Sequence, residues 1–175
     1  MPRPGPNALI DRVDERNRSV GTVARQDVFK KHANFRTVHV LVVNHAGDLL
    51  LQQLAPTRER HPLQWGSSVA GYIYAGESYE EAARRRLREE LGLETSLHAV
   101  GVTPMEDEGV TKFVGVFVTV ADHPQVEEPD HIAAIEFRPQ ADIEQDVRLH
   151  ADTYTQSLRH VLAFWLQQGR PGLPE

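Results

Sequence analysis

Residues 71–93 read GYIYAGESYEEAARRRLREELGL, and their spacing predicts more about this chain than any other stretch. Ser78 followed three residues later by Glu81 is a capping-box pattern, which predicts that a helix begins there. Gly92 stands where a helix often ends on a left-handed residue. The stretch therefore predicts a loop, a helix and a second loop. The spaced positions are Gly71, Glu77, Arg85, Leu87, Glu89, Glu90, Gly92 and Leu93.

The side chains of the predicted helix divide into an apolar stripe and charged pairs. Ala83, Leu87 and Leu91 recur every four residues and so lie on one side, as expected for a buried face. Arg85 and Arg86 each precede a glutamate by four residues, a spacing that allows ion pairs. An ordinary surface helix would show such pairs too, but the complete spacing of the motif behind a strand favours a functional site.

This motif closely resembles the Nudix box, the loop-helix-loop in which Nudix hydrolases hold magnesium against a diphosphate. The resemblance implies an α/β fold, a Nudix-type α/β/α sandwich with a mixed sheet. Mg²⁺ and Mn²⁺ prefer hard oxygen ligands, so the predicted metal ligands are Glu89 and Glu90, helped by the backbone carbonyl of Ala70 or its neighbour. Arg85 and Glu77 are expected to support these carboxylates.

The chemistry expected of such a site is hydrolysis. A metal ion that bridges a diphosphate offsets its charge and lowers the pKa of a bound water that can attack phosphorus. The predicted function is therefore divalent-metal-dependent cleavage of a phosphoanhydride bond in a nucleoside diphosphate derivative or a nucleotide, with Mg²⁺ or Mn²⁺ as cofactor. The expected partner is a small phosphorylated molecule, in the first place a nucleotide. The predicted catalytic residues are Glu77, Arg85, Glu89 and Glu90.

Arg86 departs from the Nudix box, which usually has a glutamate at that position. A guanidinium has no acceptor and does not act as a base in proteins. Three explanations stay open: the site has lost a metal ion, Arg86 contacts the phosphate, or another carboxylate is the base. The alternative function is a Nudix module that binds a nucleotide without turnover. The candidate replacement bases are Glu106, Asp107 and Glu108, with Glu127 and Glu128 behind them.

Two arginines followed three residues later by ELG also resemble Nudix-fold isopentenyl-diphosphate isomerases, and the resemblance covers residues 9–94. It implies an N-terminal β-hairpin extension. However, the isomerase's catalytic cysteine is Ala70 here, its metal-binding histidine is Tyr72, and the glutamates of its later strand align with Val110 and Lys112. Isomerisation needs an acid and a base on either side of a double bond. An isomerase is therefore the least favoured of the three functions.

Specificity is expected to depend on aromatic and basic side chains around the motif, because aromatic faces stack on bases and guanidinium groups bind phosphate. The predicted substrate-binding residues are Arg58, Tyr72 and Arg86. Further candidates are Trp65, Tyr74 and Phe113 for a base, of which Trp65 and Phe113 are typical core residues, and Arg60 and His61 for a second phosphate. We expect His32 and His39 to be structural.

The pattern along the rest of the chain predicts a flexible tail over 1–7 and a single Nudix domain over 8–175. Residues 8–35 would form the hairpin extension and residues 36–175 the core. Expected strands span 8–13, 19–24, 36–43, 49–54, 65–71, 96–103, 112–120 and 132–138, with the pair 36–43 and 49–54 forming a second hairpin. Expected helices besides that of the motif span 26–32 and 152–168.

Composition excludes several classes of function. The net charge of −6 argues against a nucleic-acid binder, which needs a basic face to neutralise phosphates. Without cysteine there is no disulfide and no thiolate nucleophile. No run of eighteen apolar residues and no signal-peptide core occurs, which predicts a cytoplasmic protein with no membrane partner. The N-terminal hairpin could pair across a homodimer.

Overall fold

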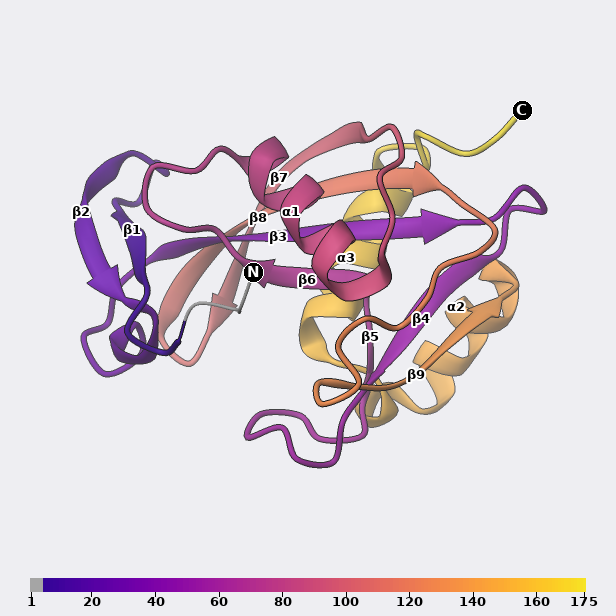
Figure 1. The fold of residues 1–175 in the computed structure, drawn as a ribbon, viewed down its shortest axis with the longest axis horizontal. Coiled ribbons are helices and arrows are strands. Elements are labelled where there is room, and N and C mark those ends of the chain that lie inside the picture. Colours follow the sequence, from indigo (N-terminus) through magenta and orange to yellow (C-terminus); the bar gives the residue numbers. More distant parts are fainter. Residues whose placement is uncertain (1–4) are drawn as a thin grey trace.

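The computed structural model describes residues 5–175, which form one large sheet with helices on both faces and a separate small hairpin (Figure 1). Of the predicted tail 1–7, residues 1–4 lie outside the described residues. Pro6 lies in a turn, and its carbonyl accepts a hydrogen bond from the amide of Gln26 at 3.0 Å.

The N-terminal hairpin is confirmed. Strand β1 (Leu9–Val13) pairs antiparallel with β2 (Ser19–Ala24). The Asp14 carboxylate closes the turn between them, because it accepts from the amides of residues 16 and 18 at 2.8 and 2.9 Å. The helix predicted over 26–32 is only a single 3₁₀ turn, η1 (Arg25–Asp27), followed by further turns.

The main sheet has seven strands in the order β5-β4-β3-β8-β7, with β6 beside β3 and β9 beside β4. It is mixed, because β3 runs parallel to β8 and antiparallel to β6. The strands are β3 (Phe35–Val43), β4 (Leu49–Leu54), β5 (Trp65–Gly66), β6 (Val69–Tyr72), β7 (His98–Asp107), β8 (Val110–Val120) and β9 (Ile132–Arg138).

Two expectations about these strands are wrong in part. The predicted second hairpin pairs only at its turn, Val43 with Leu49, after which β4 continues along β9. The strand predicted over 65–71 is divided at Ser67 and Ser68 into β5, which pairs with β4, and β6, which pairs with β3. The Ser68 hydroxyl bridges the divergence, since it accepts from the Val42 amide at 2.9 Å and donates to the Leu50 carbonyl at 2.6 Å.

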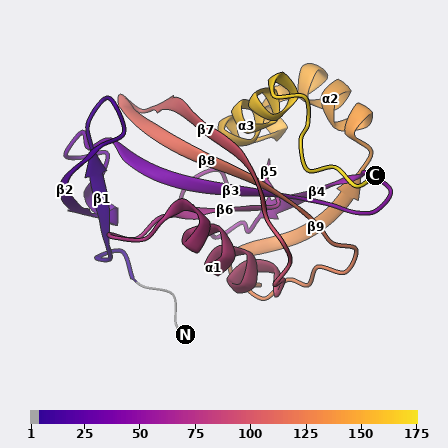
Figure 2. The same ribbon diagram turned by 90° about the horizontal axis from the view of Figure 1, so that it is seen from above.

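The helices cover both faces of the main sheet, which confirms the predicted α/β/α sandwich (Figure 2). Helix α1 (Tyr79–Leu91) packs on one face, and α2 (Gln140–Leu149) and α3 (Gln156–Gln167) lie on the other. Alternate residues of β3 serve the two cores, because Val40 packs with the α1 side and Leu41 with the α3 side. No helix in residues 5–175 is long and apolar enough to cross a membrane.

The helix boundaries follow from local chemistry in two of three cases. Both hydrogen bonds of the Ser78–Glu81 capping box are present, and Gly92 ends α1 with a φ of 65°. The predicted C-terminal helix begins four residues late, because Thr155 caps α3 by accepting from the Leu158 amide. Helix α2 was not expected; Ile143 is its only buried residue, so it has no strong apolar stripe.

Candidate functional site

Glu77, in the loop before α1, forms an ion pair with the guanidinium group of Arg85. The Glu77 carboxylate accepts two hydrogen bonds from Arg85, at 2.7 and 2.9 Å, and one from the amide of Tyr74 at 3.0 Å. Arg85 also donates to the Tyr72 carbonyl at 3.1 Å and to Glu89 at 3.3 Å. A bidentate pair of this kind is rigid, so Glu77 and Arg85 hold the end of β6 and Glu89 in one arrangement.

Glu90 is buried, with 3% of its surface exposed, and is held from three directions. Its carboxylate accepts from the side chain of Gln52 on β4 and from the amide of Ala70 on β6, both at 3.2 Å. The guanidinium of Arg86 lies 3.3 Å away on the third side. The predicted metal ligand is therefore fixed against the backbone of Ala70, whose carbonyl was expected to assist it.

Arg86 occupies the middle of a glutamate cluster. Its guanidinium lies 2.5 Å from Glu89, 3.3 Å from Glu90 and 3.3 Å from Glu128, and the side chain is 2% exposed. Burial disfavours the cation, but the attraction of Glu90, Glu128 and Glu89 outweighs burial, so the pKa of Arg86 lies above its ordinary value. Gly71 makes room for this side chain, because a Cβ there would lie 2.5 Å from the Arg86 Nε.

The groups around Arg86 include oxygen donors of the kind that bind a divalent ion. Carboxylate oxygens of three glutamates already converge on one positive centre, and hard oxygens of this type are what magnesium binds. Within residues 5–175 no three histidine, aspartate or glutamate side chains form a group that could hold an ion by themselves. The Arg86 guanidinium lies between Glu89, Glu90 and Glu128. These carboxylates are donors of the kind that magnesium binds, but an ion would have to compete with Arg86 for them.

The candidate replacement bases lie in different places. Of the five, Glu128 lies in the cluster, through its contact with Arg86. Asp107 is paired with Lys112 at 2.9 Å and with Arg60 at 3.0 Å, and although its burial opposes the shift, these contacts hold its pKa below the ordinary value. Glu106 accepts from the Thr111 hydroxyl, which ties it to the β7–β8 hairpin.

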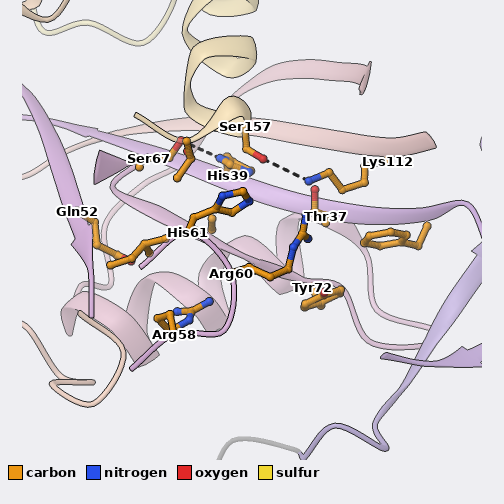
Figure 3. Close-up of a pocket in the computed structure, with 16 residues that line it drawn as sticks. Thr37, His39, Gln52, Arg58, Arg60, His61, Ser67, Tyr72, Lys112 and Ser157 are labelled. Carbon is orange, nitrogen blue, oxygen red and sulfur yellow. Dashed lines mark hydrogen bonds between the residues drawn. The ribbon is translucent and has the colours of Figure 1, made fainter. Parts of the chain in front are cut away.

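Two cavities lie next to each other at the C-terminal end of β6, the strand that leads into the motif. The smaller holds about 190 Å³ and the larger about 560 Å³, and the second value is in the usual range for a ligand site. Both are bordered by Ala70, Gly71 and Tyr72 of β6 and by Arg58 and Arg60 of the β4–β5 loop. Figure 3 shows Arg58, Arg60 and His61 of this loop around the smaller cavity. Of the predicted substrate-binding residues, Arg58 and Tyr72 line both cavities and Arg86 lines neither.

Most of the aromatic side chains proposed to stack on a base are already covered. Arg138 lies over the ring of Trp65, at 4.4 Å from its centroid, and Arg85 over the ring of Tyr74 at 4.0 Å. Phe113 is buried. Tyr72 alone of the four lines the cavities, where it stacks on Phe35. The burial of Phe113 agrees with a core residue, and Trp65 packs against the core on the α3 face of the sheet.

His39, for which the sequence analysis expected a structural role, is buried and lines the smaller cavity. Its Nδ1 lies 2.8 Å from the Ser67 hydroxyl (Figure 3). Complete burial, helped by the charges of Lys112 and His160, lowers the pKa of His39 to about 3. The imidazole is therefore neutral in the folded protein at every pH at which the protein is normally handled.

This neutral histidine predicts a pH-dependent stability. Below its unfolded pKa of about 6.5 the unfolded chain gains a proton that folded His39 does not take, so stability falls with pH. Between pH 7.5 and pH 5 the loss from this group is about 2 kcal/mol. His39→Asn should remove that part of the pH dependence in urea unfolding, whereas His123→Asn at an exposed site should not. Equal pH dependence in wild type and His39→Asn would contradict the assignment.

Several cavity and cluster residues were not found from the sequence. Gln52, which bonds Glu90, and Thr37 lie in ordinary β-rich runs with no motif around them. Lys112 was noted only as a departure from the isomerases, and it lies in the smaller cavity. A lysine or glutamine inside an apolar strand is the only signal that could have drawn attention to such residues.

Comparison with known sequences shows the family. A family profile described as NUDIX domain matches residues 33–160. An uncharacterised Nudix hydrolase of Pseudomonas aeruginosa is 30% identical over 139 residues, which are 78% of this chain and 82% of the relative. An isopentenyl-diphosphate Delta-isomerase of Nocardia farcinica is 42% identical over 97 residues, or 53% of this chain and 54% of the isomerase.

Solved structures share the fold. A crystal structure from Deinococcus radiodurans matches with a TM-score of 0.78 at 25% identity and covers 89% of this chain and 97% of its own. The Nudix domain of NrtR from Shewanella oneidensis, solved in complex with ADP ribose, matches with a TM-score of 0.60 at 17% identity over 79% of this chain and 87% of its own. With the motif helix, the mixed sheet and the glutamate cluster described above, these matches show that the chain belongs to the Nudix family.

Proposed function

We propose that this chain is a divalent-metal-dependent Nudix hydrolase that cleaves a phosphoanhydride bond of a nucleoside diphosphate derivative or a nucleotide. One observation carries the proposal. Glu90 is fixed by hydrogen bonds from Gln52 and from Ala70, a residue that borders both cavities, and the adjacent carboxylate of Glu89 is held by Arg85. Acidic groups that bind a cation thus lie beside a space lined by groups that bind an anion.

Glu89, Glu90 and the Ala70 carbonyl would hold Mg²⁺ or Mn²⁺. The ion, when bound, supplies charge neutralisation of the phosphates and a water of lowered pKa. Glu77 and Arg85 keep Glu89 in place through the bidentate pair. Because Arg86 has no acceptor, the proton of the attacking water needs a carboxylate, and Glu128 is the one that the fold brings into the cluster.

The chain's own basic residues would orient the substrate. Arg25, Arg58 and Arg60 line the larger cavity, and guanidinium groups match phosphate oxygens in charge and geometry. The ADP ribose bound by the Shewanella oneidensis Nudix domain supports a small nucleotide-like ligand for this chain too. Cytoplasmic localisation and a homodimer stay predictions.

A second candidate is a Nudix module that binds the same ligand without turnover. The observation that favours it is the position of Arg86, whose guanidinium contacts the carboxylates that a metal ion would use. An isomerase stays the least favoured function, because the chain has no cysteine. Ala70 and Tyr72 stand where the isomerases have their catalytic cysteine and a metal-binding histidine.

A substrate panel separates the two candidates. Purified protein is incubated with nucleoside diphosphate derivatives and nucleoside triphosphates, with Mg²⁺, with Mn²⁺ and with EDTA, and the released nucleotide and phosphate are quantified. We expect turnover that EDTA abolishes. Saturable binding without turnover on any member of the panel would instead identify the non-catalytic module. In a separate incubation with isopentenyl diphosphate, formation of its double-bond isomer would identify an isomerase.

A further inference from the structure

The smaller cavity has a polar floor on the α3 face of the sheet, formed by Thr37, Lys112 and Ser157 (Figure 3). We propose that this floor is an anion subsite that takes a phosphate monoester group. If the proposed hydrolase function holds, the substrate would carry a phosphate monoester in addition to the diphosphate at the motif. Binding of a phosphate monoester in the cavity does not depend on that function.

The hydroxyl of Thr37 is the first observation. Thr37 is 8% exposed and lines the cavity, and its buried Oγ1 has no hydrogen-bond partner within residues 5–175. A buried hydroxyl left without a partner is costly, so native proteins satisfy nearly all of them. The Oγ1 atom is closed to solvent in this conformation, so a ligand oxygen in the cavity would provide the missing partner once the Thr37 side chain turns its hydroxyl toward the cavity.

Lys112 is the second observation. It lies on β8 directly beside Phe35 of β3, two residues from Thr37, so both side chains project from the same face of the sheet. Lys112 is 8% exposed, and its ammonium group contacts the Asp107 carboxylate at 2.9 Å and the Ser157 hydroxyl at 3.2 Å. An ammonium has three donors, and these contacts use two of them.

The N-terminus of α3 is the third contribution. Thr155, its capping residue, and Ser157, in its first turn, both line the cavity. A helix of twelve residues carries partial positive charge and free amides at this end, which favours anions. The N-terminus of α3, the hydroxyls of Thr155 and Ser157 and the ammonium group of Lys112 therefore border the same cavity. This combination of groups is suited to binding phosphate.

The charge of the cavity agrees with an anion. Three cations line it: Arg58, Arg60 and Lys112. Asp107, which pairs with Arg60 and Lys112, and Glu108, which lies 3.8 Å from Arg60, are both outside the lining. Burial and the charge of Arg60 lower the pKa of His61, which disfavours a charge on its imidazole. This positive pocket occurs in a chain whose net charge is −6.

The floor is connected to the catalytic motif. Gln52 and Ala70 line the cavity, and each donates a hydrogen bond to Glu90. A ligand held at Glu90 could thus extend one of its groups into the cavity. The volume of about 190 Å³ corresponds to roughly six waters, enough for a phosphate and the adjacent carbon atoms but not for a nucleoside.

Binding of ribose 5-phosphate and of ribose, two probes that differ only in the phosphate, tests the proposal. Calorimetric titrations in EDTA exclude any metal-held phosphate. The wild type is expected to bind ribose 5-phosphate at least ~10-fold more tightly than ribose. Lys112→Met should weaken ribose 5-phosphate ~10- to 100-fold and Thr37→Val ~3- to 10-fold, since hydrogen bonds to charged groups are the strong ones. Lys30→Met, at an exposed lysine outside both cavities, serves as the matched control.

If Lys112→Met does not fold, Thr37→Val still measures the contribution of the subsite to binding of ribose 5-phosphate. It removes a hydroxyl that has no partner within the described residues, so the melting temperature should not fall. Equal affinity for the two probes, or wild-type affinity in Thr37→Val, would overturn the subsite. If the protein hydrolyses a panel substrate but does not prefer ribose 5-phosphate to ribose, the hydrolase proposal stands and the subsite proposal fails. If it prefers ribose 5-phosphate but hydrolyses no panel substrate, the subsite stands and the hydrolase proposal fails.

Discussion

Glu90→Gln is expected to lower metal-dependent turnover about 10²- to 10³-fold, because it removes one charge from the carboxylate pair that would hold the ion. The substitution keeps the shape of the side chain. A glutamine there can still accept from the Ala70 amide, and Arg86 keeps its contacts with Glu89 and Glu128. The loss should therefore appear in turnover and in metal affinity. The melting temperature should fall as well, because the new amide group faces the Gln52 donor and the buried Arg86 loses one charged partner.

The measurement is kcat/KM on the best substrate of the panel over a series of Mg²⁺ concentrations, together with calorimetric binding of Mn²⁺ to both proteins. Glu94→Gln is the matched control, since this glutamate follows α1, has a side chain that is 73% exposed and pairs with Arg88 at the surface. Turnover and Mn²⁺ affinity within about threefold of wild type in Glu90→Gln would place the metal site elsewhere.

Arg86→Met is expected to destabilise the fold by about 3–5 kcal/mol in EDTA, the cost typical of breaking a buried ion pair by removing one partner. The variant leaves Glu89, Glu90 and Glu128 facing one another without the guanidinium between them. Added Mg²⁺ should recover part of the loss, and stabilise the variant more than the wild type, because the ion no longer competes with an internal cation.

Urea unfolding with EDTA and with Mg²⁺ measures both effects. Arg84→Met is the control, because Arg84 is half exposed and pairs only with Glu80 one turn earlier on the surface, so its loss should cost at most about 1 kcal/mol. If Arg86→Met cost no more than the control, the glutamate cluster would not depend on Arg86. If Mg²⁺ stabilised both proteins equally, the ion and the guanidinium would not share these carboxylates.

The parts of the fold that were predictable depend on neighbours in the chain. Ser78 and Glu81 cap α1 by bonds within one turn, and Gly92 ends it through its own backbone freedom. The stripe of Ala83, Leu87 and Leu91 is buried as its period indicated. Most strands of the hairpin and of the main sheet were likewise predictable, because β-rich runs are separated by turn residues.

The parts that were missed depend on residues far apart in sequence. The break at Ser68 arises where β3 and β4 diverge, and α2 has too few buried residues to show a period. Glu128 reaches Arg86 from 42 residues away, and Gln52 reaches Glu90 from 38. Such contacts have no local signature, because chain folding alone brings the partners together.

The amino-acid sequence by itself determined the motif helix, its two adjacent glutamates and the kind of sheet that supports them, because capping, periodicity and ligand chemistry act over a few residues. Only the tertiary structure decided what surrounds Arg86 and which polar groups line the cavity beside the motif. The reason is physical: the burial and the charge environment of a side chain depend on every segment that packs against it. Arg86 is an exposed-looking helix residue in the sequence and becomes a buried cation among three glutamates once β6, α1 and the loop of Glu128 meet.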